Sequence, residues 1–347
     1  MDTPFVRIDL EILEKNIRDM ADFARAQGIR LRPHVKTHKI AEITRMQLEA
    51  GSTGITVAKL GEAEAMFAAG ARDILVAYPL VGAEKLTKVR GLLERGCKLT
   101  LMVDSVDGAR LLDQLAWPGG IDVLVEVDSG LGRGGLLPED LEGFVQWLVS
   151  LKHLNFKGLL TFEGHSYACQ DLESVKAFAV QIGEMMVAAA EALRAKGIPV
   201  AEVSIGSTPS ARWGGAVPGI TEIRPGNYVF NDATQVALGV AKPENCSLKV
   251  VSTIVSRPAK NRALIDAGAK ILAKDHGRAG YGLLANPNWQ ITRLWEEHGL
   301  IEGDNLPELG SVVEIIPNHS CPVVNLVDTV AVSNGEVWKV TARGLVR

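Results

Sequence analysis

The sequence contains few cysteines, and they do not form a recognisable pattern. Only four of the 347 residues are cysteines, namely Cys97, Cys169, Cys246 and Cys321, and they are widely separated with no CxxC pair. This spacing predicts neither a disulfide framework nor a four-cysteine zinc module. Each cysteine must therefore be judged by its own surroundings.

A strong charge of either sign is also lacking. The formal net charge of −4 at pH 7 provides no electrostatic footprint for nucleic acid or for an anionic membrane. The first ten residues lack the basic start and apolar core of a signal peptide, and no apolar run approaches the roughly 18 residues of a spanning helix. We therefore expect a cytoplasmic protein that acts on a small molecule and binds neither nucleic acid nor membrane.

Over the first two-thirds of the chain, short apolar runs alternate with amphipathic helical stretches such as 41–51 and 61–70. Eight such runs occur, at 29–38, 54–59, 73–79, 98–104, 122–128, 156–164, 201–206 and 220–228. Eight apolar strands separated by helices predict an α/β fold, a (β/α)₈ barrel of the TIM type with a parallel sheet buried on both faces. A doubly wound open sheet is the alternative.

The pattern changes after Asp232. The following strand-like runs have no helices predicted between them, and they cover 236–242, 247–258, 262–268, 311–318, 323–333 and 336–346. Such a series predicts a second, antiparallel β domain. We place the boundary near 233–245, with the barrel at 10–235 and the β domain at 236–347 together with the N-terminal segment 1–9.

The stretch LRPHVKTHK, residues 31–39, places two histidines and two lysines at the end of the first predicted strand. Barrel enzymes carry their chemistry at the C-terminal ends of the strands, so Lys36 is a candidate for the mouth of the active site. A lysine turned away from bulk water has a lowered pKa and can act as an amine nucleophile or a base. A basic surface loop is the alternative interpretation.

Two other strand ends show compatible chemistry. The run EVDSGLGRGGL, residues 126–136, has four glycines that permit close approach of the backbone to a ligand, and Arg133 supplies a cation. The seventh strand ends in Gly206, Ser207 and Thr208 before a predicted helix, which suits a phosphate but is also a common helix cap. A Schiff-base lysine and a phosphate cradle together predict pyridoxal phosphate, which has an aldehyde and a phosphate.

Six motifs, in order along the chain, give a family resemblance: RPHVKTHK, EVDSGLGRGG, GSTPS, RPGNYVFND, IDAGAK and PNHSCPVVNL. The chain resembles the fold-type III pyridoxal phosphate enzymes, which have an alanine-racemase-like barrel and a C-terminal β domain. Within them it is similar to the D-threonine aldolase and metal-dependent D-serine dehydratase group. The resemblance covers nearly the whole chain and implies a homodimer.

The resemblance also implies roles for individual residues. Lys36 would hold the cofactor as a Schiff base, Arg133 would lie beside the ring hydroxyl, and Arg224 would face the pyridine nitrogen. Phe162 stands where racemases have a histidine that stacks on the cofactor. The residues that would hold the phosphate are Gly206, Ser207 and Thr208 of GSTPS with the turn of Gly226, Asn227 and Tyr228.

Because Phe162 can stack but cannot transfer a proton, acid or base work near this position would pass to Glu163 or His165. The alternative interpretation of His165 is a solvated loop histidine.

PNHSCPVVNL suggests a second cofactor. His319 and Cys321 are at positions i and i+2 of a predicted extended segment, so their side chains would leave the same face and share a metal. Imidazole with thiolate suits zinc, although so short a motif also fits two structural residues. The resemblance implies a divalent metal, zinc or manganese or another ion, in the β domain beside the cofactor. It also implies that cysteine at the second ligand favours a dehydratase, whereas aldolases have aspartate.

The favoured function is therefore a lyase that acts on D-β-hydroxy-amino acids, by β-elimination of the D-serine dehydratase type, giving a keto acid and ammonia. Lys36 would remove the α-proton, and the metal would act as a Lewis acid on the β-hydroxyl. A D-threonine or D-3-hydroxyaspartate aldolase, giving glycine and an aldehyde, is the alternative. A racemase is less favoured because it needs no metal pair. A non-catalytic pyridoxal phosphate-binding protein of the same barrel type would usually lack the β domain, and a binding module without cofactor is the last alternative.

Overall fold

The computed structural model describes residues 2–347. The chain divides into two compact units. The barrel unit contains residues 19–36, 43–226 and 345–347, and the β unit contains the N-terminal residues up to Arg18, residues 37–42 and residues 227–344. Each unit is described separately below.

The barrel unit is built on eight parallel strands in the order β2-β9-β8-β7-β6-β5-β4-β3. Their bounds are β2 (Arg30–Leu31), β3 (Ile55–Val57), β4 (Asp73–Val76), β5 (Lys98–Val103), β6 (Ile121–Glu126), β7 (Leu154–Thr161), β8 (Glu202–Ile205) and β9 (Glu222–Ile223). The two ends of this order meet, because Thr53 N donates to Leu31 O at 3.0 Å and Thr56 N donates to Pro33 O at 2.8 Å. The strands therefore form a ring, and the predicted TIM-type barrel is confirmed.

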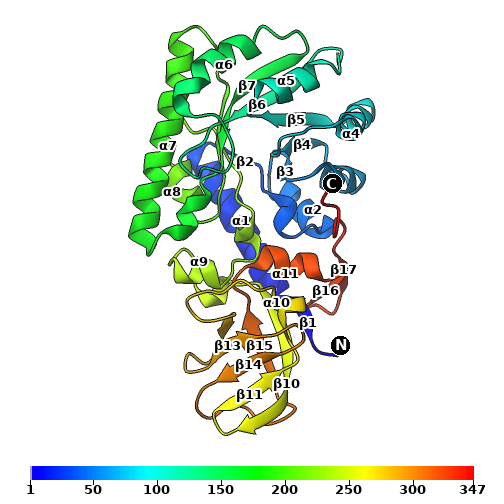
Figure 1. Ribbon diagram of the computed structural model, residues 1–347, viewed down its shortest axis with the longest axis vertical. Helices are drawn as coiled ribbons and strands as arrows, with labels where there is room; N and C mark the ends of the chain where they lie inside the picture. The colour runs from blue at the N-terminus through cyan, green and yellow to red at the C-terminus, as the bar shows by residue number, and fades with distance from the viewer. Residues whose placement is uncertain (1) are drawn as a thin grey trace. The chain divides into compact units, whose positions relative to one another are not determined.

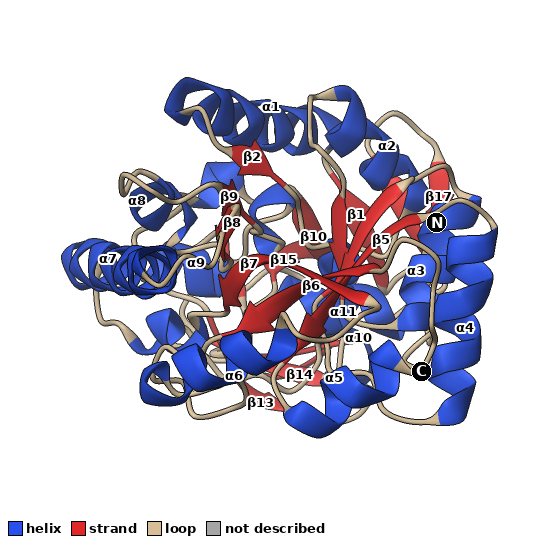
Figure 2. Cartoon of the chain, turned by 90° about the horizontal axis from the view of Figure 1, so that it is seen from above, coloured by secondary structure: helices blue, strands red, loops and turns tan. Residues whose placement is uncertain are grey.

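Helices follow the strands and lie outside them, as the view from above shows for α3 to α7 (Figure 2). The helices are α1 (Leu10–Gln27), α2 (Ala41–Glu49), α3 (Leu60–Ala68), α4 (Ala83–Glu94), α5 (Val106–Asp113), α6 (Leu141–Leu148), α7 (Leu172–Ala195) and α8 (Ala211–Gly215), with 3₁₀ turns η1 (Val35–Thr37), η2 (Pro138–Asp140) and η3 (Gly164–Ala168). Leu75, Met102, Leu124 and Leu160 come from four adjacent strands and form one buried cluster. The strands are apolar on both faces because helices cover one face and this cluster fills part of the other.

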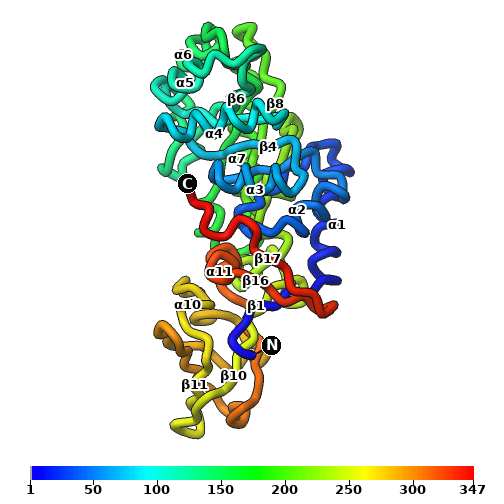
Figure 3. Tube along the Cα trace, turned by 90° about the vertical axis from the view of Figure 1, so that its right-hand side faces the viewer, coloured from blue at the N-terminus to red at the C-terminus, as the bar shows by residue number. Residues whose placement is uncertain are grey.

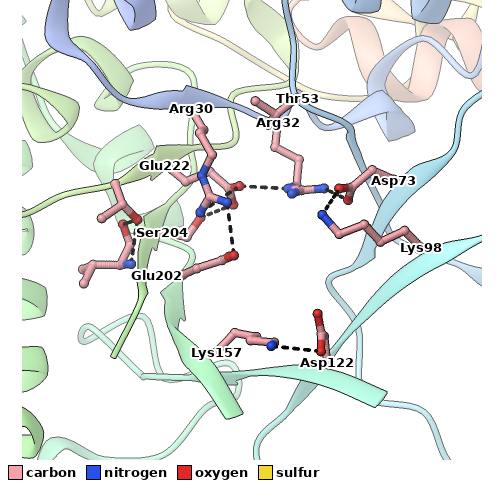
Figure 4. Close-up of polar contacts among 12 residues, drawn as sticks. Arg30, Arg32, Thr53, Asp73, Lys98, Asp122, Lys157, Glu202, Ser204 and Glu222 are labelled. Carbon is pink, nitrogen blue, oxygen red and sulfur yellow. Dashed lines mark hydrogen bonds and ion pairs between the residues drawn. The ribbon is translucent and has the colours of Figure 1, made fainter. Parts of the chain in front are cut away.

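The N-terminal ends of the barrel strands carry a network of charges (Figure 4). Arg32 is 4% exposed, donates from Nε to Glu222 at 2.8 Å and pairs through Nη1 with Asp73. Burial lowers the pKa of Arg32, but the nearby carboxylates of Glu222 and Asp73 raise it by a larger amount. The pKa therefore lies above its ordinary value, and the guanidinium stays charged. Arg30 pairs with Glu202 at 3.1 Å in the same network. Ion pairs therefore stabilise this end of the barrel, and we assign these charged side chains a structural role.

Replacing Arg32 with alanine should lower the free energy of unfolding by about 3–5 kcal/mol, because the buried carboxylate of Glu222 would lose its ion pair with Arg32 at 2.8 Å. Lys98→Ala is the matched control. Lys98 pairs with the same Asp73 at 2.5 Å but exposes 67% of its side chain, so its loss should cost less than about 1 kcal/mol. Denaturant titration of both variants measures the difference, and equal losses would contradict this assignment.

The β unit contains the remaining strands. They are β1 (Phe5–Ile8), β10 (Leu248–Ala259), β11 (Arg262–Ile265), β12 (Leu283–Leu284), β13 (Gln290–Leu294), β14 (Gly299–Glu302), β15 (Val312–Ile316), β16 (Thr329–Val332) and β17 (Val337–Lys339). Of these, β10, β11, β13, β14 and β15 are the yellow and orange arrows of Figure 1. The predicted second, antiparallel β domain is confirmed, with one exception: all pairings are antiparallel except that of β1 with β16, which is parallel.

The prediction of no helices in this part of the chain is wrong. Three short helices and one 3₁₀ turn follow Asp232, namely α9 (Ala233–Ala237), α10 (Ala269–Leu272), α11 (Ser320–Leu326) and η5 (Pro243–Asn245). The 3₁₀ turn η4 (Asn227–Val229) precedes them. Helix α11 includes the first part of the predicted strand 323–333. The apolar, β-branched run there predicts a strand, but tertiary contacts at the start of α11 favour the helix.

The last residues of the chain belong to the barrel unit. Gly61 N donates to Arg347 O at 2.9 Å, and the C-terminal end lies beside α3 in the trace (Figure 3). Gly61 is required there, because a Cβ would lie 2.9 Å from Leu345 Cβ. Across residues 2–347, no helix combines the length and apolar character needed to span a membrane.

Candidate active site and metal-binding pair

Lys36 lies at the C-terminal end of the first barrel strand, but on a 3₁₀ turn. The predicted strand 29–38 is regular only over β2, continues through an isolated bridge between His34 and Thr56, and then turns into η1. Pro33 has no N–H to donate to a strand partner, and His34 Nδ1 accepts from Lys36 N at 3.4 Å, which favours the turn. Lys36 is half-buried, and its Nζ lies 5.2 Å from the centre of the Phe162 ring.

The structure also brings Arg133 to Phe162. The Arg133 Cζ lies 4.5 Å from the centre of the ring, so two candidate residues from different strand ends meet at this phenyl group. Arg133 Nη2 lies 3.6 Å from a carboxylate oxygen of Glu126, the last residue of β6. Burial raises the pKa of Glu126, and Arg133 partly offsets this effect. Sequence reasoning did not select Glu126, although the residue begins the glycine-rich run that was singled out.

The loop after β8 has the features of an anion cradle. Ser207 and Thr208 are buried, and within residues 2–347 the buried Oγ1 of Thr208 has no hydrogen-bond partner. A buried hydroxyl without a partner is costly unless a ligand satisfies it. Gly206 cannot be replaced without a shift, because a Cβ would lie 3.0 Å from Cβ of Arg224.

Glu163 supports this loop from behind. Its carboxylate accepts from Gly206 N at 3.0 Å and from Ser210 Oγ at 2.6 Å, and Ser210 is linked to Ser207 at 2.8 Å. Glu163 is 1% exposed, and burial raises its pKa. The contacts of Glu163 therefore give it a structural role, which is to hold the loop after β8 in place. His165 is half-buried against Phe178 with ring centres 4.4 Å apart, so it is not a solvated loop residue.

Arg224 follows β9 and is 4% exposed inside the barrel unit. Its Nη2 donates to Thr161 O at 2.6 Å, and its Nη1 contacts Ser204 Oγ, which in turn donates to Glu222 at 2.7 Å. Burial lowers the pKa of Arg224, while the nearby carboxylates act in the opposite direction. The guanidinium is thus tied to the charge network at the other end of the barrel. Gly226, also in the barrel unit, follows this strand.

Asn227 and Tyr228 are buried in the β unit, on η4. Asn227 donates from Nδ2 to Asp232 at 2.5 Å, and within the described chain its Oδ1 has no hydrogen-bond partner. The same Asp232 oxygen accepts from Ser320 N at 3.2 Å, and its other oxygen caps α9 by accepting from Gln235 N at 3.1 Å. Sequence reasoning missed Asp232, whose only signal was its position before a short helical run.

His319 and Cys321 come together, but not on the extended segment that was predicted. His319 has extended backbone angles and is the N-cap of α11, whereas Cys321 lies in the first turn of the helix. The physical reason is the hydrogen bond from Ser320 N to Asp232, which satisfies a donor that a helix start would otherwise leave open. The prediction of an extended pair is therefore wrong.

The two side chains are nevertheless in hydrogen-bond contact. Partial burial lowers the pKa of His319, but the hydrogen bond to Cys321 and the negative charges of Cys321, Asp232 and Asp275 raise it to about 9. The Cys321 Sγ lies 3.3 Å from the hydroxyl of Thr37. No third histidine, cysteine, aspartate or glutamate completes a metal cluster with them anywhere in residues 2–347.

Replacing Asp232 with alanine should destabilise the protein by about 1–3 kcal/mol, because the buried donors Asn227 Nδ2 and Ser320 N would lose their acceptor. Asp275→Ala is the matched control, since Asp275 also faces His319, at 3.9 Å, but leaves 48% of its side chain exposed. It should change stability by less than about 0.5 kcal/mol. Thermal unfolding of both variants provides the comparison, and no loss in the Asp232 variant would refute the capping role.

Family models match almost the whole chain. The N-terminal domain of alanine racemase matches residues 8–234, and a serine dehydratase domain matches residues 247–333.

Curated relatives match over nine-tenths or more of this chain. A D-threo-3-hydroxyaspartate dehydratase from Delftia sp. is 37% identical over 92% of this chain and 91% of its own. A D-threonine aldolase from Arthrobacter sp. is 34% identical over 100% of this chain and 94% of its own. A D-serine dehydratase from Dictyostelium discoideum is 30% identical over 92% of this chain and 90% of its own.

The Delftia dehydratase is also similar in structure, with a TM-score of 0.90 and 34% identity over 98% of this chain and 97% of its own. Two variants of a D-threo-3-hydroxyaspartate dehydratase have the same TM-score. In one a histidine is replaced by alanine, and in the other the cysteine two positions later is replaced by alanine, in a metal-free form.

Proposed function

We propose that this chain, which belongs to the family of fold-type III pyridoxal phosphate lyases that includes D-threonine aldolase and D-serine dehydratase, is a metal-dependent dehydratase of D-β-hydroxy-amino acids. The products would be a keto acid and ammonia. D-serine and D-3-hydroxyaspartate are the substrates to be expected, because the relatives named above act on such compounds.

The observation that supports dehydration most directly is the pair His319 and Cys321. The variants of a D-threo-3-hydroxyaspartate dehydratase alter a histidine and a cysteine with the same two-residue spacing, and the structure of the cysteine variant is of a metal-free form. In this chain Cys321 lies close enough to His319 to raise the pKa of its imidazole. We therefore assign the metal to these two side chains.

The residues of the barrel unit fit pyridoxal phosphate. Lys36 would bind its aldehyde, Phe162 would lie against its ring, and Arg133 would lie near the ring hydroxyl. Arg224 would face the pyridine nitrogen, but its contacts with Thr161 and Ser204 limit the donors that it can offer. The unpartnered Thr208 hydroxyl fits a phosphate oxygen, and Gly206, Ser207 and Gly226 would add backbone and hydroxyl donors. We extend the phosphate assignment to Asn227 and Tyr228 through their backbone, since Asn227 Nδ2 is committed to Asp232.

When bound, the cofactor supplies an electron sink for the carbanion that forms at the α-carbon of the substrate. Lys36 would take up the α-proton at Nζ, because it is the titratable side chain beside Phe162 that can bind covalently and then be released as an amine. Phe162 has no group that can transfer a proton. Glu163 holds Gly206 and Ser210 and so keeps the loop in place.

His319 and Cys321 would hold a divalent metal that supplies Lewis-acid chemistry. An imidazole and a thiolate favour zinc, although manganese or another divalent ion remains open to test. With two protein ligands, coordination positions would be left for water and substrate, as in catalytic metal sites. We further propose a homodimer located in the cytoplasm that binds neither nucleic acid nor membrane.

Product analysis with D-serine, D-threonine and D-3-hydroxyaspartate tests this proposal. We expect keto acid and ammonia in equal amounts from the D-isomers. The L-isomers should give neither product. If every substrate gave glycine and an aldehyde, the protein would be an aldolase and the dehydratase proposal would be wrong.

The aldolase is the second candidate, because the Arthrobacter D-threonine aldolase matches 100% of this chain at 34% identity. It would use the same residues, with the Cα–Cβ bond broken in place of the Cβ–O bond. Racemisation is not favoured by these relatives, which are dehydratases and aldolases.

A further inference from the structure

Thr37, the residue that follows Lys36, is buried and contacts Cys321, one of the two proposed metal ligands. Its side chain is 1% exposed, and its Oγ1 lies 3.3 Å from Cys321 Sγ, although the two residues are 284 positions apart in the sequence. Both belong to the β unit. The turn η1 therefore contains the proposed cofactor lysine and a direct partner of the proposed metal ligand.

The position of Thr37 is fixed by a second contact two residues further on. Lys39 Nζ donates to Asn325 Oδ1 at 2.8 Å, and Lys39 O accepts from Ala342 N at 3.0 Å. Cys321 and Asn325 are four residues apart in α11, so they lie on the same face of the helix. The segment 37–39 thus follows one face of α11 and contacts it at both ends, which leaves the Thr37 hydroxyl little freedom to turn away.

The chemistry of the contact depends on the state of the sulfur. A thiol can donate its proton to the hydroxyl oxygen, but a thiolate that binds a metal has no proton and can only accept. The hydroxyl of Thr37 then becomes the donor. Hydrogen bonds of this kind orient metal ligands and tune their bond to the metal.

We propose that Thr37 is a positioning residue that donates a hydrogen bond from Oγ1 to the metal-bound thiolate of Cys321 and so strengthens metal binding. This inference rests on the assignment of the metal to His319 and Cys321. Removing the hydroxyl should weaken metal binding roughly 10-fold, the lower end of the effect of such outer partners.

The test adds Co²⁺ to protein that retains pyridoxal phosphate but has been stripped of metal. Difference spectra are recorded against the same protein without Co²⁺. The thiolate gives a charge-transfer band with Co²⁺, and a hydrogen bond to sulfur moves this band to shorter wavelength because it stabilises the sulfur lone pair. Thr37→Val removes the hydroxyl at nearly constant shape, and Thr37→Ser keeps it. We expect the valine variant to bind Co²⁺ more weakly with its band at longer wavelength, and the serine variant to match the wild type in both respects.

Cys321→Ala tests the metal assignment separately from the role of Thr37, because loss of the thiolate should remove the band altogether. If the band disappears in Cys321→Ala while Thr37→Val matches the wild type, the role of Thr37 is refuted and the metal assignment stands. If the band persists in Cys321→Ala, the metal assignment itself fails and the inference fails with it. Should Thr37→Val not fold, Thr37→Ala repeats the measurement without the branched side chain, and the same outcomes apply.

Discussion

Replacing Lys36 with alanine should abolish both the activity and the visible absorbance of the lysine-bound cofactor. Loss of proton transfer alone lowers a rate roughly 10²–10⁴-fold, and loss of the covalent attachment adds to this. The Nζ of Lys36, 5.2 Å from the centre of Phe162, is the amine placed for both roles. Absorbance spectra and ammonia release measure the two losses separately.

Lys59→Ala is the matched control for this experiment. Lys59 also follows a barrel strand, β3, but its Nζ lies over the ring of Tyr78, 3.4 Å from its centre. Borohydride reduction should attach the cofactor to wild-type protein and to the Lys59 variant, and not to the Lys36 variant. Retained labelling after Lys36→Ala would show that another lysine binds the cofactor.

Removing the metal should stop catalysis and leave the cofactor bound. Lewis-acid assistance contributes several kcal/mol, so chelation should lower the rate roughly 10³-fold. The absorbance of the bound cofactor should persist, because Lys36 and the loop after β8 belong to the barrel unit whereas His319 and Cys321 belong to the β unit. Activity should return when Zn²⁺ or Mn²⁺ is added, and the two ions should be compared for the extent of recovery.

His319→Ala should reproduce the effect of chelation without a chelator. The matched control is His298→Ala, an exposed histidine of the same unit that is placed in neither proposed site. Full activity of the His319 variant, or full activity after exhaustive chelation with no metal in elemental analysis, would make His319 and Cys321 ordinary structural residues. That outcome would remove the basis for preferring a metal-dependent lyase.

The barrel could be predicted because its periodicity is local. Each strand and helix is marked by apolar residues within about ten positions, and the eight strands found correspond to the eight runs identified. The strand that leads to Lys36 was predicted too long, because LRPHVKTHK is apolar enough for a strand, whereas Pro33 and the contact of His34 with the backbone of Lys36 turn it into η1.

The start of α11 could not be predicted for a different reason. The run VVNL is β-branched and apolar, which favours a strand, but Ser320 N is capped by Asp232, 88 positions away. The contact of Thr37 with Cys321 and the pairing of Arg32 with Glu222 are likewise long-range and leave no local pattern in the sequence. The candidate ligands were thus identified by residue type, while the groups that position them became visible only in the structure.

The most direct test of the central claim is a metal titration of the metal-free holoenzyme in which ammonia release from D-serine or D-3-hydroxyaspartate and protein-bound metal are measured together. A metal-dependent dehydratase predicts a rate that rises in proportion to bound metal, with keto acid equal to ammonia at every point, and no rise in the Cys321→Ala variant. Full ammonia release before any metal is bound, or glycine and aldehyde as the only products, would contradict the account.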